Sequence, residues 1–574
     1  MAIDVTVVVP VYNSGANIEA CLESLVGQTL PLERYEIVLV DDGSTDGTAA
    51  VLRAWEARHP QLIRVISEPN SGWPGRPRNV GVDAASGSYV QFVDNDDVLA
   101  ADALEAMLGA ARNSDADVVL GKLSSDFRTV NHAVYRHNAE RVTWADFPLV
   151  ESLTPHKMFR TSLLREHDIR FGEGPRQLED QVFCMHAYGH ARSVSVVADR
   201  PCYFYRRRRG FGRNAGDVEV EPDDYYRDVE EVLDVIGAHT ADEALRARLA
   251  LRFFRVEMLG RLRDRLMLDY TDDYRRRVFG QVADLAARRL PVAVDDALPF
   301  FVRRQARLLR AGDLGGMLSF AKELDTLAVI AELVRPVWVD GRLRLDIDAS
   351  LQWQEQPLTR ERLATIDPAV DDLLSDAAVD VVVINRADAT TWYVGRSLTV
   401  ADDGALRIRG VVDLDPRTTA AGRPLSPGLW NVRLRAVLGG ITRTLRLPVG
   451  DQPLRSWCLY GDERDAAIAY NGAEDELALD VGGWMHDLGT HVSESLATSG
   501  DWQVSDVVAA RPVTRTADLF IETGEGITRV AARLDVTSSG ARLRPRRDVQ
   551  PGSRAWLRVG SPGTSPPVLV RTEP

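Results

Sequence analysis

The sequence predicts an α/β domain with a mostly parallel sheet, then a helical segment and two tandem antiparallel β-sandwiches of immunoglobulin-like type. Three observations support this. Short β-branched runs alternate with amphipathic helices near the N-terminus, helical spacing dominates from about residue 222 to 334, and period-two alternation follows Pro336. We therefore expect domains at residues 1–220, 221–336, 337–450 and 451–574.

The N-terminal pattern is repeated βαβ. A buried parallel strand is expected at 4–10, where DVTVVVP is rich in β-branched residues. Further strands are expected at 35–40, 63–67 and 89–93, and helices at 16–28, 48–59 and 79–85. This order predicts an open parallel sheet with helices on both faces.

Polar residues follow each of these strands directly. In open parallel sheets, ligands bind beyond the carboxyl ends of the strands. The ends carry Pro10-Val11-Tyr12, Asp41-Asp42, Glu68-Pro69-Asn70 and Asp94-Asn95-Asp96. The sequence therefore predicts a ligand site at this edge of the sheet.

The remaining segments are less specific. Arg-rich amphipathic helices in 221–336 are expected to pack on the N-terminal α/β domain or on one another, with membrane-surface or partner binding as the alternative. After Pro336, strands are punctuated by Gly and Pro, and SPGLWNVRLRAV weakly resembles QPGSRAWLRVGS. Such modules bind carbohydrate, assemble subunits or space other domains.

Composition narrows the class of protein. The net charge of −15 argues against general nucleic-acid affinity. Neither a signal peptide nor a membrane-spanning helix is expected. The four cysteines are widely spaced, without a CxxC pair, which favours a reducing cytoplasm. The first turn, PVYNSG, lacks GxGxxG, which argues against a dinucleotide-dependent oxidoreductase.

The acidic run VDNDD is the main chemical signal. Strand periodicity places Asp94 and Asp96 on the same side of the chain. Carboxylates gathered at a strand end suit Mg²⁺ or Mn²⁺, which would offset charge on a phosphate leaving group. Taken alone, DxD is a weak motif, since acidic loops are usually only solvated. Asp97 is expected to cap the helix that follows.

Five motifs together resemble a known family. VVVPVYNSG, VDDGSTDGT, NSGWPGRPRNVG, GSYVQFVDNDD and LEDQVF occur in the order and approximate spacing of the family 2 inverting glycosyltransferases, which have a GT-A fold. The match covers about residues 4–210. The plan of the whole chain is similar to that of the poly(ribitol-phosphate) β-N-acetylglucosaminyltransferases, which decorate wall teichoic acid and include a trimeric form.

The resemblance implies roles for the residues at the strand ends. Pro10 and Tyr12 would line the uridine pocket, although Tyr12 taken alone fits a buried aromatic equally well. Asp42 and Asn70 would contact the uracil. Arg78 would stand near the diphosphate or the acidic cluster; Arg76 is less certain. Asp94 would touch the ribose or the metal, and Asp96 would ligate the metal directly.

The acceptor side is implied in the same way. Inversion requires a carboxylate that removes the proton of the acceptor hydroxyl. The resemblance assigns this to Asp180, with Glu179 in support, although an acidic pair opening a helix is usually only complementary to the helix dipole. YFYRRRRGFGRN resembles an active-site lid, in which Arg207 would hold phosphate; a solvated charge run is the alternative. His156 and Lys157 fall on the acceptor side or have a structural role.

The resulting expectation is a metal-dependent transferase that uses a UDP-sugar. We expect N-acetylglucosamine to pass in β linkage to a polyol-phosphate polymer such as wall teichoic acid, in the cytoplasm or at the inner face of the membrane. A homo-oligomer, by resemblance a trimer, and peripheral membrane association are further expectations. The alternatives are a capsular-polysaccharide, exopolysaccharide or glycolipid acceptor, or a carbohydrate-binding assembly protein with an inactive GT-A domain.

Overall fold

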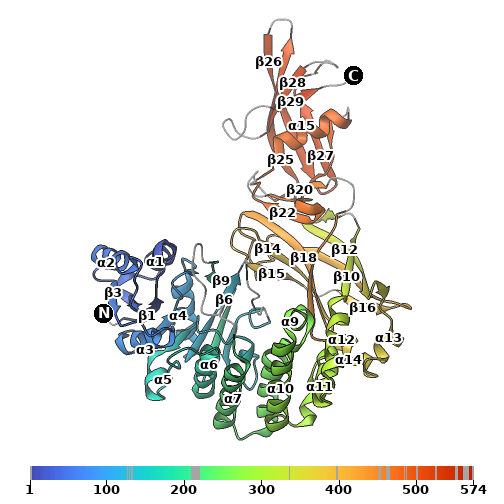
Figure 1. The fold of residues 1–574 in the computed structure, drawn as a ribbon. Helices are drawn as coiled ribbons and strands as arrows, with labels where there is room; N and C mark the ends of the chain where they lie inside the picture. Colours follow the sequence, from blue (N-terminus) through green and yellow to red (C-terminus); the bar gives the residue numbers. More distant parts are fainter. Residues whose placement is uncertain are drawn as a thin grey trace. The chain divides into compact units, whose positions relative to one another are not determined.

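The computed structural model forms two compact units, Met1–Thr326 and Leu327–Pro574, each described here by itself (Figure 1). The structure describes residues 3–125, 127, 130, 133–207, 220–334, 336–395, 398–449, 454–460, 466–483, 485–486, 488–499, 502–523, 526–547, 549, 554–559 and 568–571. Among these residues no helix is long and apolar enough to cross a membrane.

The first unit is built on one mixed sheet with the strand order β3-β2-β1-β4-β8-β6-β9-β5, and β7 pairs with β9. Its strands are β1 (Val5–Val11), β2 (Tyr35–Asp41), β3 (Ile63–Ser67), β4 (Tyr89–Phe92), β5 (Val98–Leu99), β6 (Val118–Ser125), β7 (Ala139–Val142), β8 (Met158–Arg160) and β9 (Val194–Tyr205).

Strands β3, β2, β1 and β4 are mutually parallel, as the βαβ pattern predicted. Every residue of β1 is buried, because helices cover both faces of the sheet (Figure 1). Beyond β4 the sheet is mixed: β8 pairs antiparallel with β4 and β6, whereas β6 and β9 are parallel. This arrangement places the C-terminal end of β9 close to the acidic run that follows β4.

Helices connect these strands. They are α1 (Ile18–Val26), α2 (Thr48–Arg58), α3 (Gly75–Ala84), α4 (Ala103–Ser114), α5 (Thr161–Glu166) and α6 (Glu179–His190). Helix α3 begins four residues before the predicted helix at 79–85, since Pro74 and Gly75 open it. A Cβ on Gly81 would lie 2.2 Å from Cγ1 of Val8, so a glycine at this position lets α3 pack closely on β1.

Residues 222–325 are helical. The helices are α7 (Pro222–His239), α8 (Glu243–Phe253), α9 (Asp264–Asp269), α10 (Asp272–Arg289), α11 (Phe300–Arg310) and α12 (Leu314–Asp325). Ion pairs join α10 to α7: Glu230 pairs with both Arg288 and Arg289. The helices end earlier than the predicted boundary at 336, because residues 328–333 form the strand β10. The alternation of that strand, AVIAEL, is too short to stand out against the preceding helices.

The second unit is rich in antiparallel sheet. One sheet, the proximal sheet, contains β10 (Ala328–Leu333), β11 (Val337–Val339), β12 (Arg342–Trp353), β13 (Gln356–Pro357), β16 (Thr399–Asp402) and β17 (Leu406–Leu414). A second, the middle sheet, contains β14 (Ala378–Asn385), β15 (Thr391–Val394), β18 (Gly428–Leu438), β19 (Ile441–Arg446), β20 (Arg455–Leu459), β21 (Ala466–Asn471), β22 (Leu477–Val481) and β24 (Val507–Ala509). Helices α13 (Arg360–Ala364) and α14 (Val370–Asp376) lie between their strands in sequence.

The middle sheet runs across residue 450, where the sequence predicted a boundary between two sandwiches. Residues 428–431 of β18 pair antiparallel with residues 478–481 of β22, which joins the strands on either side. Such long-range pairing leaves no local signal in the sequence, because hairpin turns report only neighbouring strands.

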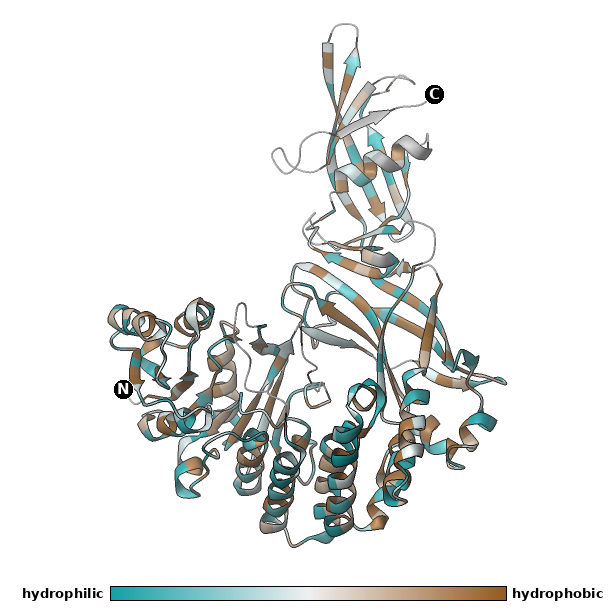
Figure 2. Ribbon diagram, viewed as in Figure 1, coloured by the Kyte–Doolittle hydropathy of each residue, from teal (hydrophilic) through white to brown (hydrophobic). Residues whose placement is uncertain are grey.

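A third sheet, the distal sheet, ends the chain. It contains β23 (Gln503–Val504), β25 (Val513–Thr523), β26 (Gly526–Thr537), β27 (Gly540–Pro545), β28 (Arg554–Val559) and β29 (Val568–Arg571), with α15 at Leu488–Ser499. Alternate residues of β25, β26, β27 and β28 form a core with Leu488, Val492 and Leu496 of α15. The alternating brown and teal along these strands reflects one buried and one exposed face (Figure 2).

Candidate active site

The carboxyl ends of β1, β2 and β4 meet at one edge of the mixed sheet. Val11 lies opposite Asp41, and Asn95 donates a hydrogen bond from Nδ2 to the carbonyl oxygen of Pro10 at 2.9 Å. The run VDNDD is thereby held against the carboxyl end of β1. The polar residues that follow these strands in sequence therefore lie at one edge of the sheet, where a ligand site was predicted.

The two residues expected to contact the base lie together. Nδ2 of Asn70 donates to the backbone carbonyl of Asp42 at 2.9 Å, and the Asp42 carboxylate accepts hydrogen bonds from the backbone N–H and hydroxyl of Ser71. Asp41 accepts a hydrogen bond from the N–H of Ser44, which stabilises the turn after β2. The structure thus orients Asp42 through the loop after β3.

Tyr12 is 44% exposed. This excludes the alternative of a buried aromatic at a strand end. An exposed ring immediately after β1 offers an apolar surface on which a planar ring could stack.

Arg78 lies at the centre of the acidic residues. Its side chain is 4% exposed; Nη2 donates to Oδ1 of Asp94 at 3.0 Å, and Nη1 donates to Oδ1 of Asp180 at 2.9 Å. Nη1 is also 3.7 Å from Oε1 of Glu179. Because Arg78 comes from α3 and Asp180 from α6, one guanidinium links the strand-end site to the predicted base.

These contacts set the charge of the site. Burial opposes ionisation of Asp94, but His156 and Arg78 outweigh it and lower the pKa of Asp94. Burial, together with the nearby Asp180 carboxylate, raises the pKa of Glu179 to about 8, despite Arg78. Glu179 is therefore mostly protonated at pH 7, whereas Asp94 is an anion.

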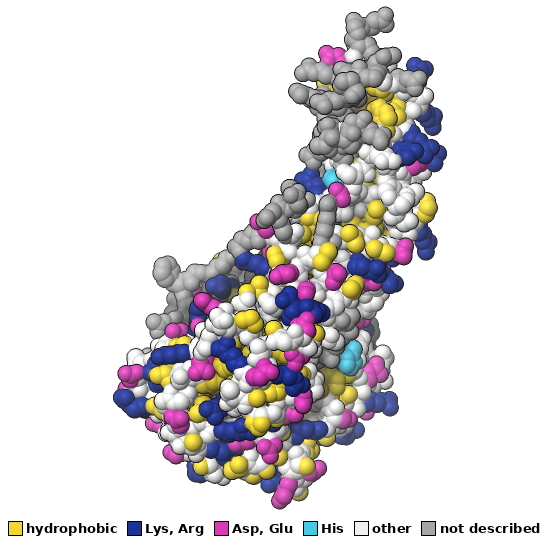
Figure 3. Space-filling view, turned by 90° about the vertical axis from the view of Figure 1, so that its right-hand side faces the viewer, with side chains coloured by type: hydrophobic (Ala, Val, Ile, Leu, Met, Phe, Trp, Pro, Cys, Tyr) yellow, Lys and Arg dark blue, Asp and Glu magenta, His cyan; other side chains and the backbone are white. Residues whose placement is uncertain are grey.

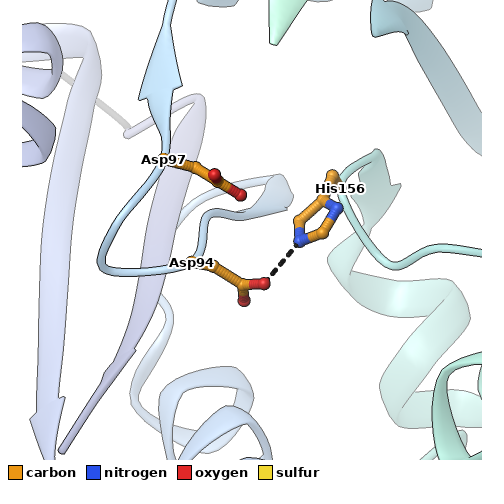
Figure 4. A group of neighbouring side chains, drawn as sticks. All are labelled: Asp94, Asp97 and His156. Atoms are coloured by element: carbon orange, nitrogen blue, oxygen red, sulfur yellow. Dashed lines mark hydrogen bonds and ion pairs between the residues drawn. The ribbon is translucent and has the colours of Figure 1, made fainter. Parts of the chain in front are cut away.

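His156 orients Asp94 from the opposite side (Figure 4). Its Nε2 is 3.0 Å from Oδ2 of Asp94, and its Nδ1 is 2.9 Å from the hydroxyl of Tyr205. Burial lowers the pKa of His156, which favours a neutral ring that donates through Nε2 and accepts at Nδ1. The ring also stacks on Tyr203 with centroids 4.4 Å apart.

Asp97 is buried in the same site and is not a helix cap, contrary to the expectation. Its carboxylate accepts hydrogen bonds from the hydroxyl of Tyr203 at 2.6 Å and from the N–H of Arg206 at 2.8 Å. Helix α4 begins only at Ala103, with Asp102 at the N-cap position. Burial and the neighbouring Asp94 and Asp96 raise the pKa of Asp97.

Asp94, Asp97 and His156 form a group that fits a divalent cation. One atom of each residue lies within 4.8 Å of the others: the two carboxylates can ligate the cation, and His156 orients Asp94 through Nε2. Hard oxygen ligands suit Mg²⁺ and Mn²⁺, and a cation there would relieve the repulsion that raises the pKa of Asp97. The predicted ligand Asp96 lies between these carboxylates in sequence, is half-buried, and contributes to that repulsion.

The remaining predicted residues lie around this centre. Arg207 follows Arg206, and its guanidinium carbon is 5.6 Å from the ring centroid of Phe127. The predicted lid residues 208–214 lie outside the described residues. Arg76 is 40% exposed and pairs with Glu68. Lys157 is buried and donates to the carbonyl of Thr154, which is a structural role.

The structure brings Tyr203 and Tyr205 into the site, although sequence reasoning took from this segment only its arginines. A signal was present: in YFY the two tyrosines are two residues apart on a strand, so their side chains share one face. Their partners, Asp97 and His156, could not be identified from the sequence.

Comparisons with known proteins agree with this geometry. Residues 6–195 match the family described as glycosyl transferase family 2, and residues 222–321 match the glycosyl transferase TarS linker domain. A poly(ribitol-phosphate) beta-glucosyltransferase of Bacillus spizizenii is 32% identical over 321 residues, which cover 56% of this chain and 50% of that protein. The poly(ribitol-phosphate) beta-N-acetylglucosaminyltransferase TarS of Staphylococcus aureus is 35% identical over 222 residues, 38% of each chain. The matched regions thus span half or less of these curated relatives.

Solved structures of TarS are also similar to this chain. The crystal structure of S. aureus TarS 1-349 in complex with UDP-GlcNAc has a TM-score of 0.51 and 28% identity, and covers 62% of this chain and 97% of that one. That of S. aureus TarS has a TM-score of 0.53 and 20% identity over 96% of this chain and 97% of that one, which shows the fold alone. The predicted fold class, a GT-A domain, a helical linker and antiparallel C-terminal sheets, is confirmed. Residues 6–195 are therefore identified as a glycosyl transferase family 2 domain, and residues 222–321 as a TarS linker domain that follows it.

Proposed function

We propose that this chain is an inverting glycosyltransferase that moves a sugar, N-acetylglucosamine, from its UDP-sugar to a polyol-phosphate polymer in β linkage. The observation that carries the proposal is the bridge made by Arg78. It holds Asp94, on the donor side, and Asp180, on the acceptor side, within 3.0 Å of one guanidinium. The two relatives described above are named poly(ribitol-phosphate) transferases, which supports this acceptor class.

The donor would bind at the strand-end edge. Tyr12 would stack on the uracil, Asp42 and Asn70 would hydrogen-bond it, and Pro10 would line the pocket. Arg78 and Arg207 would face the diphosphate. This set lies at the edge where open α/β sheets bind nucleotides.

A divalent cation, Mn²⁺ or Mg²⁺, would be held by Asp94 and Asp97, with Asp96 beside them and His156 orienting Asp94. When bound, it would offset the charge that develops on the UDP leaving group.

Asp180 would act as the base. Its side chain is 31% exposed, so an acceptor hydroxyl can reach it, and it opens α6, whose N-terminus stabilises the carboxylate. Asp180 would take the hydroxyl proton as the oxygen attacks the anomeric carbon and the bond to UDP breaks. Glu179, largely protonated at pH 7, would donate a hydrogen bond to the acceptor or to Asp180.

The proposal extends to the setting of the enzyme. All four cysteines are free and buried, which suits a reducing compartment, so we place the enzyme in the cytoplasm, at the inner face of the membrane where its polymer is made.

We also propose a homo-oligomer, a trimer, with contacts made by the C-terminal unit. Mass measurement in solution, with and without residues 327–574, tests the assembly: an unchanged mass on truncation contradicts it.

UDP release across a panel of UDP-sugars tests the activity. With Mn²⁺ and poly(ribitol-phosphate), release should be confined to one donor and stimulated by the polymer. UDP-glucose is the informative competitor of UDP-GlcNAc, because one relative is named a glucosyltransferase. Release from no donor would refute the enzymatic proposal, whereas release stimulated only by neutral glycans would refute the acceptor.

A further inference from the structure

The distal sheet exposes a face rich in arginine. Alternation along its strands places one set of side chains on α15 and the other set in solvent. The face opposite α15 carries Arg529, Arg533, Arg542, Arg544 and Arg558, with the acidic Glu522 and Asp535 and the buried Asp518. The whole chain carries a net charge of −15, whereas this face has more arginines than acidic residues. The charge of the face is therefore opposite in sign to that of the chain.

The register of the strands places these arginines side by side. Arg533 of β26 lies directly opposite Arg544 of β27, and Asp518 of β25 lies opposite Arg558 of β28. Neighbouring strands are about 4.8 Å apart, so these arginines, from β26, β27 and β28, share one face with Asp518 and Phe520 of the intervening β25. Figure 3 shows dark-blue side chains gathered on the upper part of the molecule, to which the distal sheet belongs.

The acidic residues organise this patch without neutralising it. Asp518 pairs with both Arg529 and Arg558, and Asp535 pairs with both Arg533 and Arg544. A guanidinium has five N–H donors, and the bonds of Arg529 to Asp518 use only its Nε and one Nη. Each carboxylate therefore orients two arginines that keep donors for a further anion.

Two aromatic residues lie among the arginines. Phe520 of β25 is paired directly with Trp556 of β28 and with Arg529 of β26, and both aromatic side chains are half-buried on the exposed face. The guanidinium carbon of Arg558 is 5.2 Å from the Phe520 ring centroid. Flat aromatic surfaces pack against carbon chains and sugar faces, whereas arginines bind phosphate. The aromatic rings can therefore contact the carbon chain of a polyol phosphate, and the arginines can bind its phosphate groups.

The proximal sheet provides a contrast. Its exposed face also carries arginines, but acidic residues match them in number. These residues are Arg342, Arg344, Arg407 and Arg409, with Glu332, Asp346, Asp348 and Asp413. A balanced face of this kind gives no net attraction for a polyanion.

We propose that the exposed face of β25, β26, β27 and β28 binds the anionic polyol-phosphate polymer and so retains the acceptor near the enzyme. This inference rests on the acceptor class proposed above. We assign a polyanion to this face because the face is positively charged, although the chain as a whole is negatively charged. Retention at a second site raises the effective concentration of the polymer at the catalytic centre without any change in the chemical step.

Binding of the full chain to poly(ribitol-phosphate) tests the proposal, with neutral dextran as the comparison polymer. The test variant is Arg533→Gln/Arg544→Gln, which removes two arginines that are about 60% exposed and share Asp535. The matched control is Arg407→Gln/Arg409→Gln, whose arginines share Asp348 on the proximal sheet. Exposed substitutions of this kind leave the fold intact.

We expect about tenfold weaker polymer binding and a smaller salt dependence for the test variant, because charge-assisted contacts to phosphate are lost. The control variant should bind as the wild type does. UDP release without polymer should be the same for all three proteins. Dextran should bind to none of them with comparable affinity.

Several outcomes would overturn the inference. They are equal polymer binding by wild type and test variant, equal weakening of both variants, preference for vesicles of anionic lipid over the polymer, or a change in oligomeric mass with unchanged polymer affinity. The last two would assign the face to a membrane or to a second copy. Failure of the proposed function is separate: it would appear as absence of UDP release from the wild type, whether or not the polymer binds.

Discussion

Arg78 and Asp180 are 102 residues apart in sequence, yet their side chains are 2.9 Å apart. The five motifs identified Arg78, Asp94 and Asp180 individually as candidates. That one guanidinium joins the last two could not be predicted, because it depends on how α3 and α6 pack. Asp97 was misassigned for the same reason: its partner, Tyr203, is 106 residues away, whereas the cap assignment used only local sequence.

At this residue scale, Arg78→Lys should abolish most activity. An ammonium group cannot bond two carboxylates as a planar guanidinium does, so Asp94 and Asp180 would lose their fixed separation. We expect a fall of at least about 100-fold in kcat/KM for the UDP-sugar, with a lower Tm. Arg76→Lys is the matched control, since Arg76 is 40% exposed and forms an ion pair with Glu68. Equal losses in both variants would contradict the bridging role.

The raised pKa of Glu179 predicts how the stability of the folded chain depends on pH. Its pKa in the folded protein is about 8, above the ordinary 4.5, so the folded chain keeps a proton that the unfolded chain releases between these values. Glu179 therefore destabilises the folded state increasingly as pH rises from 5 to 8. The Tm of the wild type relative to Glu179→Gln should fall across this range. A constant difference in Tm would show that Glu179 titrates normally.

At the scale of elements, the parallel strands β1 to β4 were predictable because each is a local β-branched run. The mixed half was not, since β8, β6 and β9 pair across long stretches of chain. The same limitation explains the middle sheet, whose pairing of β18 with β22 crosses the predicted boundary. Local periodicity identifies strands, whereas their partners depend on tertiary packing.

Helix α3 shows how element packing supports the site, because Gly81 contacts β1 one turn after Arg78. Gly81→Ala should cost about 1–3 kcal/mol, since the new methyl group would overlap Val8. UDP binding should weaken as α3 and Arg78 shift. Gly109→Ala in α4 is the control: nothing lies within 4 Å of its Cβ, so it should be neutral or stabilising. Chemical denaturation of both variants measures the difference. Equal stability of Gly81→Ala and the wild type would contradict the close packing.

At the scale of the whole molecule, the residues proposed to act in catalysis belong to the first unit, Met1–Thr326, and the arginine face belongs to the second. A chain ending at Thr326 should therefore keep donor-specific UDP release without polymer. Its KM for poly(ribitol-phosphate) should rise, while kcat with saturating short acceptor stays within about twofold. Loss of donor turnover in a truncated chain that is still folded by circular dichroism would show that the site needs the second unit.

In the proposed mechanism, Asp180 acts as the base of an inverting transfer within the site organised by Arg78. The most direct measurement is transfer of labelled N-acetylglucosamine from UDP-GlcNAc to poly(ribitol-phosphate), with the anomeric configuration of the product determined by NMR. Wild type should form a β-linked product, and Asp180→Asn should lose about 10²- to 10⁴-fold in kcat while it still binds UDP. Asp168→Asn, an exposed control, should behave as wild type. An α-linked product, or full activity of Asp180→Asn, would contradict the account.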